Sequence, residues 1–157
     1  MKSDAWEAGH RMPFIVRWPG TVAPGSSSGE TISFVDLLAT FASITGYERK
    51  PGEGPDSFDF SKVLRGTQPS EKPVRPSLAL RSGGGHMTIR VGDWKLIDAL
   101  GSGGFSEPRK RKPKAGEAPG QLYNLKEDPA EKNNRYLERS DIVTRLRKEL
   151  EAVKAPN

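Results

Sequence analysis

The second half of the chain alternates between apolar and polar positions. The alternation covers residues 87–91 and, after the dipeptide Gly92-Asp93, continues over residues 94–98. Two such runs joined by a two-residue turn predict a β-hairpin. The turn sets a register in which the apolar side chains share one face: Met87, Ile89, Val91, Trp94 and Leu96. The polar side chains are expected on the opposite face of the hairpin: Thr88, Arg90 and Lys95.

Two more short apolar runs flank this hairpin. Residues 77–81 precede it and residues 121–125 follow it, and both have the length of a strand. Together with the hairpin they predict a small four-stranded antiparallel sheet, whose apolar face needs a cover. A C-terminal helix, which Ser140 can cap, is expected to supply that cover through apolar residues at helical spacing: Ile142, Val143, Leu146, Leu150 and Val153.

The first half of the chain begins with a short apolar run. Residues 14–18 are mostly apolar and lie between Pro13 and the pair Pro19-Gly20. A run of this length between turn residues predicts a buried strand that is closed by a turn.

A helical pattern follows after a loop. Residues 33–45 carry apolar side chains at helical spacing over a wide face, so we expect a largely buried helix. Thr31 or Ser33 is the expected N-cap and Gly46 the expected end. A shorter helix is expected within residues 56–64.

Composition narrows the class of protein without naming a chemistry. Of the 157 residues 34% are hydrophobic, and the 17 Gly and 13 Pro indicate a loop-rich fold with a modest core. No apolar run approaches the roughly 18 residues that cross a membrane, so no membrane span is expected. The chain has no Cys, which excludes disulfides, thiolate metal sites and a cysteine nucleophile within it.

The net charge of +5 is concentrated in one basic run, residues 109–114. Gly-rich and Pro-rich stretches flank this run, so we expect a solvated surface loop. Such a loop can attract nucleic acid, an import receptor or a polyanionic glycan. No aromatic residue is interleaved with the basic ones, as single-strand binding would require. Nucleic acid is therefore not an expected partner.

The first residues of the chain carry a spaced set of charged and small residues. Lys2, Glu7, Gly9 and Arg11 precede Pro13, and the run after them ends in Trp-Pro-Gly. This segment resembles the one that opens the C-terminal part of type I sulfatases, roughly Lys-Gly-x-x-x-Glu-Gly-Gly-x-Arg-x-Pro. Further segments resemble that family in the same order: 33–45 with Val-Asp-Leu-x-x-Thr, 89–97 with Arg-x-Gly-x-Trp-Lys-Leu, the glycine loop 101–109, and 122–131 with Leu-Tyr-Asp-Leu-x-x-Asp-Pro-x-Glu, where this chain has Asn124.

The resemblance implies an α/β fold, namely the C-terminal part of an alkaline-phosphatase-like sulfatase. Its small four-stranded antiparallel sheet would be covered by the C-terminal helix. Residues 1–70 would be the C-terminal edge of the sulfatase α/β domain. Residues 71–157 would form the antiparallel subdomain with the terminal helix. The expected partner of this part is the missing N-terminal sulfatase domain.

The same resemblance implies that the complete enzyme hydrolyses sulfate esters with a formylglycine hydrate as nucleophile and a bound calcium ion. The formylglycine motif Cys-x-Pro-x-Arg is absent here, and of the catalytic parts only Lys2 maps onto this chain. Lys2 would bind the sulfate group, where a compact ammonium neutralises charge on the sulfate and on the departing oxygen. The chain alone is therefore expected to be inactive and to bind no calcium.

Two histidines are candidate substrate-lining residues. His10 lies within the opening motif, and His86 follows three glycines at the start of a predicted strand. Two His so far apart make no metal site on their own, so no metal ligands are assigned within the chain. Glu7, Gly9 and Arg11 are expected to be structural and to form a tight turn pinned by charge pairs.

Two functional hypotheses stay open. The first is the C-terminal fragment of a sulfatase acting on a small-molecule or glycan sulfate ester, with aryl, glycan and choline sulfates all possible. The second is a non-catalytic module that binds anions or sulfated glycans, or a pseudogene product. Against independence, the strand at 14–18 and the helix at 33–45 are too apolar to be left uncovered. A periplasmic or secreted location is implied for the complete family protein alone.

Overall fold

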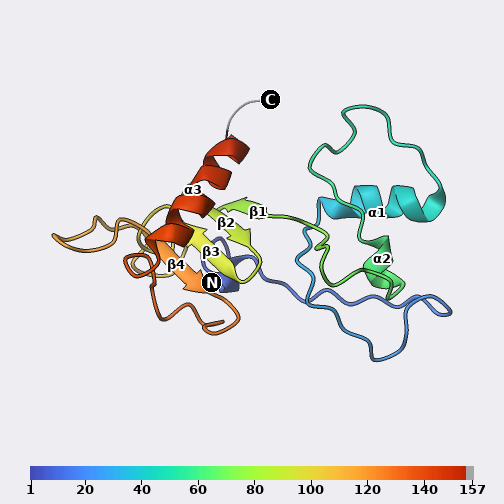
Figure 1. The fold of residues 1–157 in the computed structure, drawn as a ribbon, viewed down its shortest axis with the longest axis horizontal. Coiled ribbons are helices and arrows are strands. Elements are labelled where there is room, and N and C mark those ends of the chain that lie inside the picture. Colours follow the sequence, from blue (N-terminus) through green and yellow to red (C-terminus); the bar gives the residue numbers. More distant parts are fainter. Residues whose placement is uncertain (155–157) are drawn as a thin grey trace. The chain divides into compact units, whose positions relative to one another are not determined.

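The computed structural model of the chain describes residues 1–154 (Figure 1). Its residues divide into two compact units. Unit 1 combines Met1–Pro13 with the described part of Ser77–Asn157, and unit 2 is Phe14–Pro76. No helix within residues 1–154 is long and apolar enough to cross a membrane.

Unit 1 contains the predicted four-stranded antiparallel sheet, in the order β1-β2-β3-β4. The bounds of its strands are β1 Leu78–Arg81, β2 Met87–Val91, β3 Trp94–Ile97 and β4 Gln121–Asn124. The predicted hairpin register is confirmed, since Val91 pairs with Trp94 and Ile89 with Leu96. The turn between them holds Gly92 at a φ of 57°, a left-handed conformation that glycine adopts without strain.

The C-terminal helix α3, Ser140–Lys154, covers the apolar face of this sheet, as predicted (Figure 1). Ile89 and Leu96 from the sheet join the buried residues of α3 in one apolar core: Ile142, Val143, Leu146 and Leu150. Val153 departs from the predicted stripe, because it is 55% exposed near the end of the helix. Burying each of these large side chains contributes roughly 1.5–3 kcal/mol, so this core is the main support of unit 1.

The N-terminal segment Met1–Pro13 packs on the opposite face of the sheet. Ala5 and Trp6 form a second apolar cluster with Ile97 and Tyr123. The single 3-10 turn of this segment, η1, covers Glu7–Gly9. The face with the polar residues of the hairpin is thus covered as well, and the sheet lies between α3 and the N-terminal segment.

Unit 2 has no strand at residues 14–18, so that prediction is wrong for the structure described. These residues are not hydrogen-bonded into a sheet, and Ile15 is 90% exposed. A strand needs a neighbouring strand to satisfy its backbone groups, and unit 2 contains only helices and loops. The apolar run is real, but its pairing partner is not among residues 14–76.

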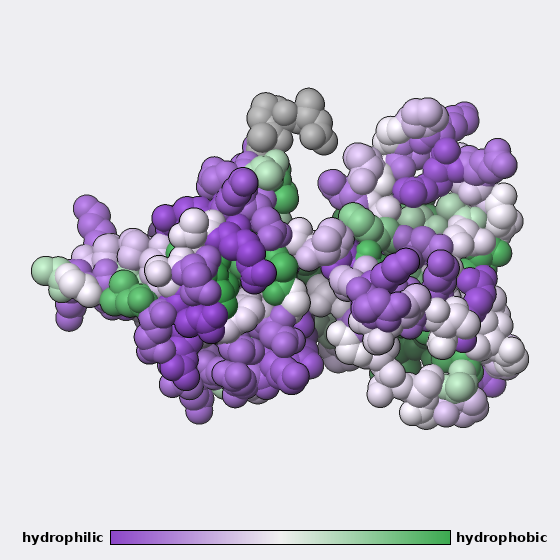
Figure 2. Space-filling view, in the orientation of Figure 1, coloured by the Kyte–Doolittle hydropathy of each residue, from purple (hydrophilic) through white to green (hydrophobic). Residues whose placement is uncertain are grey.

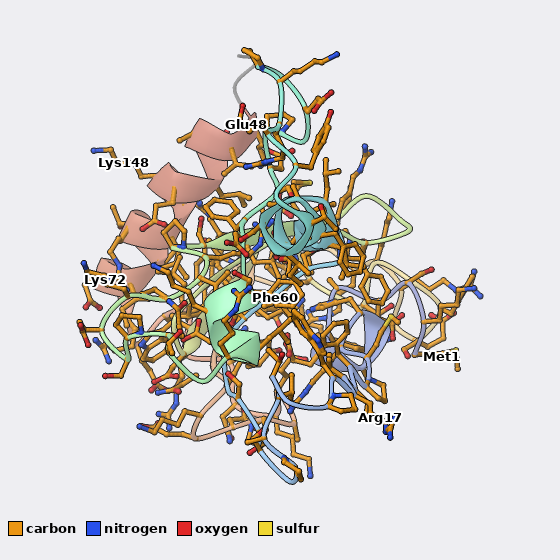
Figure 3. All side chains as sticks on the ribbon, turned by 90° about the vertical axis from the view of Figure 1, so that its right-hand side faces the viewer. Met1, Arg17, Glu48, Phe60, Lys72 and Lys148 are labelled. Carbon is orange, nitrogen blue, oxygen red and sulfur yellow. The ribbon has the colours of Figure 1, made fainter. Side chains whose placement is uncertain are left out.

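The two predicted helices of unit 2 are present, α1 at Asp36–Thr45 and α2 at Ser61–Leu64. Gly46 ends α1 in a left-handed conformation with a φ of 73°, as expected. The start differs from the prediction, because α1 begins at Asp36 and neither Thr31 nor Ser33 is its N-cap. The backbone N–H of Ser33 instead donates to the Asp36 carboxylate at 2.7 Å. Phe60, labelled in Figure 3, lies directly before α2 and is 2% exposed.

The interior of unit 2 is built around one buried ion pair. Arg75 donates to both carboxylate oxygens of Asp36 at 2.8 Å, and the backbone N–H of Phe58 also donates to this carboxylate at 2.9 Å. Thr40, one turn further along α1, accepts a hydrogen bond from the N–H of Phe60 at 3.1 Å. These polar contacts attach the loop before α2 to helix α1, and they explain the Asp and Thr of the helical motif as structural residues.

The expectation that the first helix is largely buried is wrong for the structure described. Its apolar side chains form an exposed stripe, which we call the α1 stripe: Phe34 58%, Val35 53%, Leu38 46% and Phe41 58% exposed. Figure 2 shows hydrophobic atoms at the surface of the part that carries α1. Within unit 2 nothing covers this stripe, because the residues that α1 buries are small or polar ones, such as Ala39 and Thr40. The predicted division of the chain at residue 70 stays a prediction.

Candidate functional site

The N-terminal segment carries Lys2 at the surface of unit 1. Lys2 is exposed and lies in a turn, and Ser3 after it has a φ of 69°. A left-handed backbone is uncommon for a residue other than glycine and tends to occur where the surrounding structure imposes it. Here the backbone oxygen of Ser3 accepts a hydrogen bond of 2.9 Å from the N–H of Gly83. Lys2 is therefore attached to a chain segment that the glycine loop 83–85 holds in place.

Asp4 fixes this segment to a second loop. Its side chain is fully buried and accepts hydrogen bonds from the backbone N–H of Phe105 at 2.8 Å and from the Ser106 hydroxyl at 2.6 Å. Burial alone would raise the pKa of Asp4, but hydrogen bonds from the terminal amino group, Ser106 and Phe105 lower it to about 2. Asp4 is thus ionised at neutral pH and orients the loop that contains Phe105.

Gly9 is required by the same arrangement. A side chain at this position would overlap the backbone of Asp4, so only glycine allows the 3-10 turn to approach the segment before it. This contact explains why the opening motif has a glycine here. The contact agrees with a structural role for Gly9, and that role stays a prediction.

Glu7 lies in a buried ionic cluster with a lysine from the sheet. The Lys95 ammonium, 1% exposed, lies 2.9 Å from Glu7 Oε1 and 2.9 Å from Glu131 Oε1. His10 Nε2 donates to Glu7 Oε1 at 3.2 Å. Burial raises the pKa of Glu7, but the hydrogen bond from His10 and the charge of Lys95 outweigh it and lower the pKa to about 2. The cluster joins the N-terminal segment, strand β3 and the loop after β4.

The two glycine loops and the N-terminal segment line an open pocket of ≈ 520 Å³. We call it the glycine pocket, and its lining is Ser3, Gly83, Gly84, Gly103, Gly104, Phe105, Glu107, Arg109 and Lys110. Ligand pockets commonly have volumes of about 300–1,000 Å³, so this one has the size for a small molecule or a sugar unit. All of its lining residues belong to unit 1.

His86 lies behind the wall of the glycine pocket. It is 7% exposed, and its Nδ1 atom has no hydrogen-bond partner among the described residues. A side chain on Gly103 would overlap the imidazole ring, so this glycine lets the loop close over His86. Burial, and then the charge of Lys110, lowers the pKa of His86, which is therefore neutral at pH 7.

The structure thus separates the residues that the sequence singled out. Ser3, next to Lys2, lines the glycine pocket, whereas Lys2 itself, His10 and His86 are not among the lining residues. Glu7, Gly9 and His10 lie in or next to the 3-10 turn, and Arg11 is exposed. The roles of Lys2, His10 and His86 toward a substrate stay predictions. Within residues 1–154, no cluster of His, Asp or Glu has an arrangement that could hold a metal ion, so these residues do not fit a calcium site.

Sequence reasoning did not find Asp4, Lys95 or Lys110. Asp4 and Lys95 each meet partners about a hundred positions away in the chain, and no local pattern marks such a contact. Lys110 is one of several basic residues in a run, and the sequence alone does not say which of them faces a pocket. Alternation did place Lys95 on the polar face of the hairpin, which is where the ionic cluster lies.

Comparisons with known proteins point in one direction. Of the curated proteins, the N-acetylgalactosamine-6-O-sulfatase of Bacteroides thetaiotaomicron is 31% identical to the chain over 98% of its length. Arylsulfatase G of Canis lupus familiaris is 29% identical over 83% of the chain. No family model matches the chain.

Solved structures give the same picture. A structure from work on the metabolism of multiple glycosaminoglycans by Bacteroides thetaiotaomicron matches 98% of the chain with a TM-score of 0.80 and 30% identity. A structure in complex with its substrate D-glucosamine-2-N,6-O-disulfate matches 89% with a TM-score of 0.64 and 24% identity, and therefore supports the fold alone. The chain spans 29% and 25% of the two curated relatives, and 31% of the first structure.

Proposed function

Because the chain is a homologue of the C-terminal portion of sulfatases, we propose that it forms the last part of an arylsulfatase-like enzyme that hydrolyses sulfate esters. The observation that carries this proposal is the extent of the likeness, 98% of this chain against 29% of the relative. In the complete enzyme, the missing N-terminal domain would supply the formylglycine nucleophile and the calcium ligands. The chain by itself would then be inactive.

Within that enzyme, Lys2 is the residue of this chain that would contact the sulfate. Three features support the role: Lys2 is exposed, it is the neighbour of a residue with a left-handed backbone, and that neighbour lines a pocket. An ammonium group held at such a place lowers the energy of the negative charge that develops on the departing oxygen. Asp4 acts behind it as a positioning residue, because it attaches the segment to the loop of Phe105.

The substrate class that we propose is a sulfated sugar. One relative is named as an N-acetylgalactosamine-6-O-sulfatase, and the structural neighbour at 30% identity comes from work on glycosaminoglycans. The glycine pocket is consistent with this class, because it combines an exposed aromatic ring with cationic side chains. Aromatic faces and a few charged groups are typical of pockets that bind polar ring-shaped ligands.

The exposed α1 stripe supports a larger protein around this chain. An apolar surface of this kind, formed by four neighbouring large side chains, is typical of a face that another part of the protein covers. We propose that the missing N-terminal sulfatase domain covers it. In that case residues 14–18 would also find the neighbouring strand that they lack within unit 2.

The test of this proposal is sulfatase activity of the complete gene product. Lys2→Ala should lower kcat/KM for a sulfate ester by about 10²–10³-fold, the effect of removing one group that stabilises developing charge. The matched control is Lys148→Ala, which removes an exposed lysine from the outer side of α3 (Figure 3) and should leave the rate unchanged. Equal rates for the two variants, or hydrolysis by residues 1–157 alone, would contradict the proposal.

The alternative, a stand-alone module that binds sulfated glycans, is favoured by one observation. All lining residues of the glycine pocket and the whole basic run lie within unit 1. The mass of the native product separates the two hypotheses. A product several times heavier than 17.2 kDa supports the enzyme, and a product of that mass supports the binding module or a pseudogene.

A further inference from the structure

We propose that the glycine pocket binds a second acidic group of the substrate, a carboxylate or sulfate on the sugar next to the reacting one, and that Lys110 is the cation that selects it. The inference rests on the proposed function for the position of the reacting sulfate near Lys2. It goes beyond that function because it assigns a separate anion subsite and a specificity residue.

The rim of the pocket carries the charged side chains of Glu107, Arg109 and Lys110. Arg109 and Glu107 form an ion pair of 3.2 Å, so their charges largely cancel. Arg111, next in the chain, pairs with Glu117. Lys110 lies between these two pairs, and no ion-pair partner of Lys110 is found within residues 1–154. The pocket therefore offers one uncompensated positive charge, which favours an anionic ligand.

The Lys110 side chain lies close to the glycine loop 83–85. It runs past the backbone of Gly84, where an added Cβ atom would be 3.3 Å from Lys110 Cε. Gly84 in turn donates a backbone hydrogen bond to the oxygen of Gly103 at 2.5 Å, which joins the two glycine loops. The Lys110 side chain thus passes the junction of the two glycine loops that line the pocket, and the residue is exposed, so its ammonium is accessible to a ligand.

The exposed ring of Phe105 indicates the shape of the ligand. Phe105 is 53% exposed although its backbone is fixed by the buried Asp4 carboxylate at 2.8 Å. An exposed aromatic ring on a rigid loop offers a flat apolar surface, and a sugar ring has an apolar face of matching size. A sugar lying on Phe105 would present its acidic substituent to Lys110 across the pocket, which measures ≈ 520 Å³.

The proposed subsite is linked to the proposed catalytic lysine through the N-terminal segment. Ser3 lines the pocket, and Lys2 is its direct neighbour in the chain. Consecutive Cα atoms are about 3.8 Å apart, so the backbone of Lys2 lies next to the wall of the pocket, and the proposal assigns the anion at Lys2 and the anion at Lys110 to one glycan. The substrate class that fits is therefore a glycan with at least two acidic groups, in preference to a simple aryl or choline sulfate.

The test compares two probes on residues 1–157 by isothermal titration calorimetry at low ionic strength. One probe is a chondroitin 6-sulfate disaccharide, which carries a uronate carboxylate beside the sulfated sugar, and the other is N-acetylgalactosamine 6-sulfate. Lys110→Ala should weaken binding of the disaccharide about tenfold, the effect of losing one charge-assisted contact, and change the monosaccharide less than twofold. The matched control Lys112→Ala removes the same charge from an exposed residue of the same loop that does not line the pocket. It should leave both affinities within twofold.

Three results would overturn the inference: equal losses for Lys110→Ala and Lys112→Ala, equal affinity of the unmodified chain for the two probes, or no binding of either probe. Circular dichroism of each variant shows whether it is folded, and Lys110→Gln provides a second, more conservative substitution. The outcome is independent of the activity assay. A preference for the disaccharide that depends on Lys110, in a complete product without sulfatase activity, would keep the subsite and reject the enzyme. An active sulfatase whose Lys110→Ala variant binds both probes normally would keep the enzyme and reject the subsite.

Discussion

The two units of this chain hold themselves together by different means. Unit 1 buries large apolar side chains between a sheet and a helix, and then covers the other face of the sheet with its own N-terminal segment. Unit 2 buries a carboxylate, a guanidinium and hydroxyls around Asp36 and leaves the large apolar side chains of the α1 stripe outside. The two units therefore differ in the burial of large apolar side chains, and this difference, not the number of helices or strands, shows which unit covers its own apolar surface.

The largest expected effect comes from a substitution that breaks the ionic cluster of unit 1. Lys95→Met would remove the buried ammonium between the Glu7 and Glu131 carboxylates and leave Glu7 with its weaker contacts to His10 and Arg90. Removing one partner of a buried ion pair costs about 3–5 kcal/mol, and we expect a loss of that size in the free energy of unfolding by urea. The control is Lys148→Met on the exposed side of α3, for which a change within about 0.5 kcal/mol is expected. Equal effects of the two substitutions would show that the cluster does not hold unit 1 together.

A core truncation in α3 is expected to have the next largest effect. Leu146 is 0% exposed and lies in the main core of unit 1. Leu146→Ala should lower the free energy of unfolding by about 2–5 kcal/mol, because it removes buried methyl groups and leaves a cavity. Urea unfolding followed by circular dichroism measures this loss. A loss below about 1 kcal/mol would mean that α3 is not packed on the sheet in solution.

Acid should weaken unit 1 through the buried carboxylates of Glu7 and Asp4. The pKa of Glu7 is lowered to about 2 from an ordinary 4.5, and that of Asp4 to about 2 from 3.8. A lowered pKa means that the unfolded chain takes up protons first. The stabilisation is complete above pH ~4.5 and is lost as the pH falls toward 2. The thermal midpoint should therefore decline over this range, and Glu7→Gln should flatten the decline. An unchanged slope in Glu7→Gln would contradict the assignment to Glu7.

The smallest expected effect lies in the α1 stripe. Phe41 is 58% exposed, so Phe41→Ala should change the free energy of unfolding of residues 1–157 by less than about 0.5 kcal/mol. In the complete gene product the same substitution should cost about 3–5 kcal/mol if another domain covers the stripe. Parallel urea titrations of the two forms measure the difference. The same small cost in both would mean that nothing packs on this side of α1.

The sequence predicted most of unit 1 because its signals are local. The alternation on both sides of Gly92-Asp93 determines the hairpin register, and the spacing of Ile142, Leu146 and Leu150 determines which side of α3 is buried. Both patterns act between neighbours in the chain or in the sheet, where the physical rule is simple.

The errors fall in unit 2, and the residues that the sequence missed lie at the site; in both places the contacts are long-range. An apolar run such as residues 14–18 forms a strand only beside another strand, and no such neighbour lies within unit 2. The helix at Asp36–Thr45 was found, but its burial depends on a surface that unit 2 does not contain. At the site, Lys2 was singled out by resemblance, whereas the contact of Asp4 with Ser106 spans 102 positions and has no local signature.

The ionic cluster also determines the order in which unit 1 can assemble. Glu7 and Lys95 are 88 positions apart, whereas the strands of the sheet and helix α3 follow one another closely along the chain. Closing so long a loop costs more conformational entropy than pairing neighbouring strands, so the sheet can form while the N-terminal segment is still free. Within unit 1 the N-terminal segment is synthesised before the sheet and docks after it. The lysine proposed to bind sulfate and the pocket beside it therefore reach their final structure at the end of folding. In hydrogen exchange, this region should be the first part of unit 1 to open.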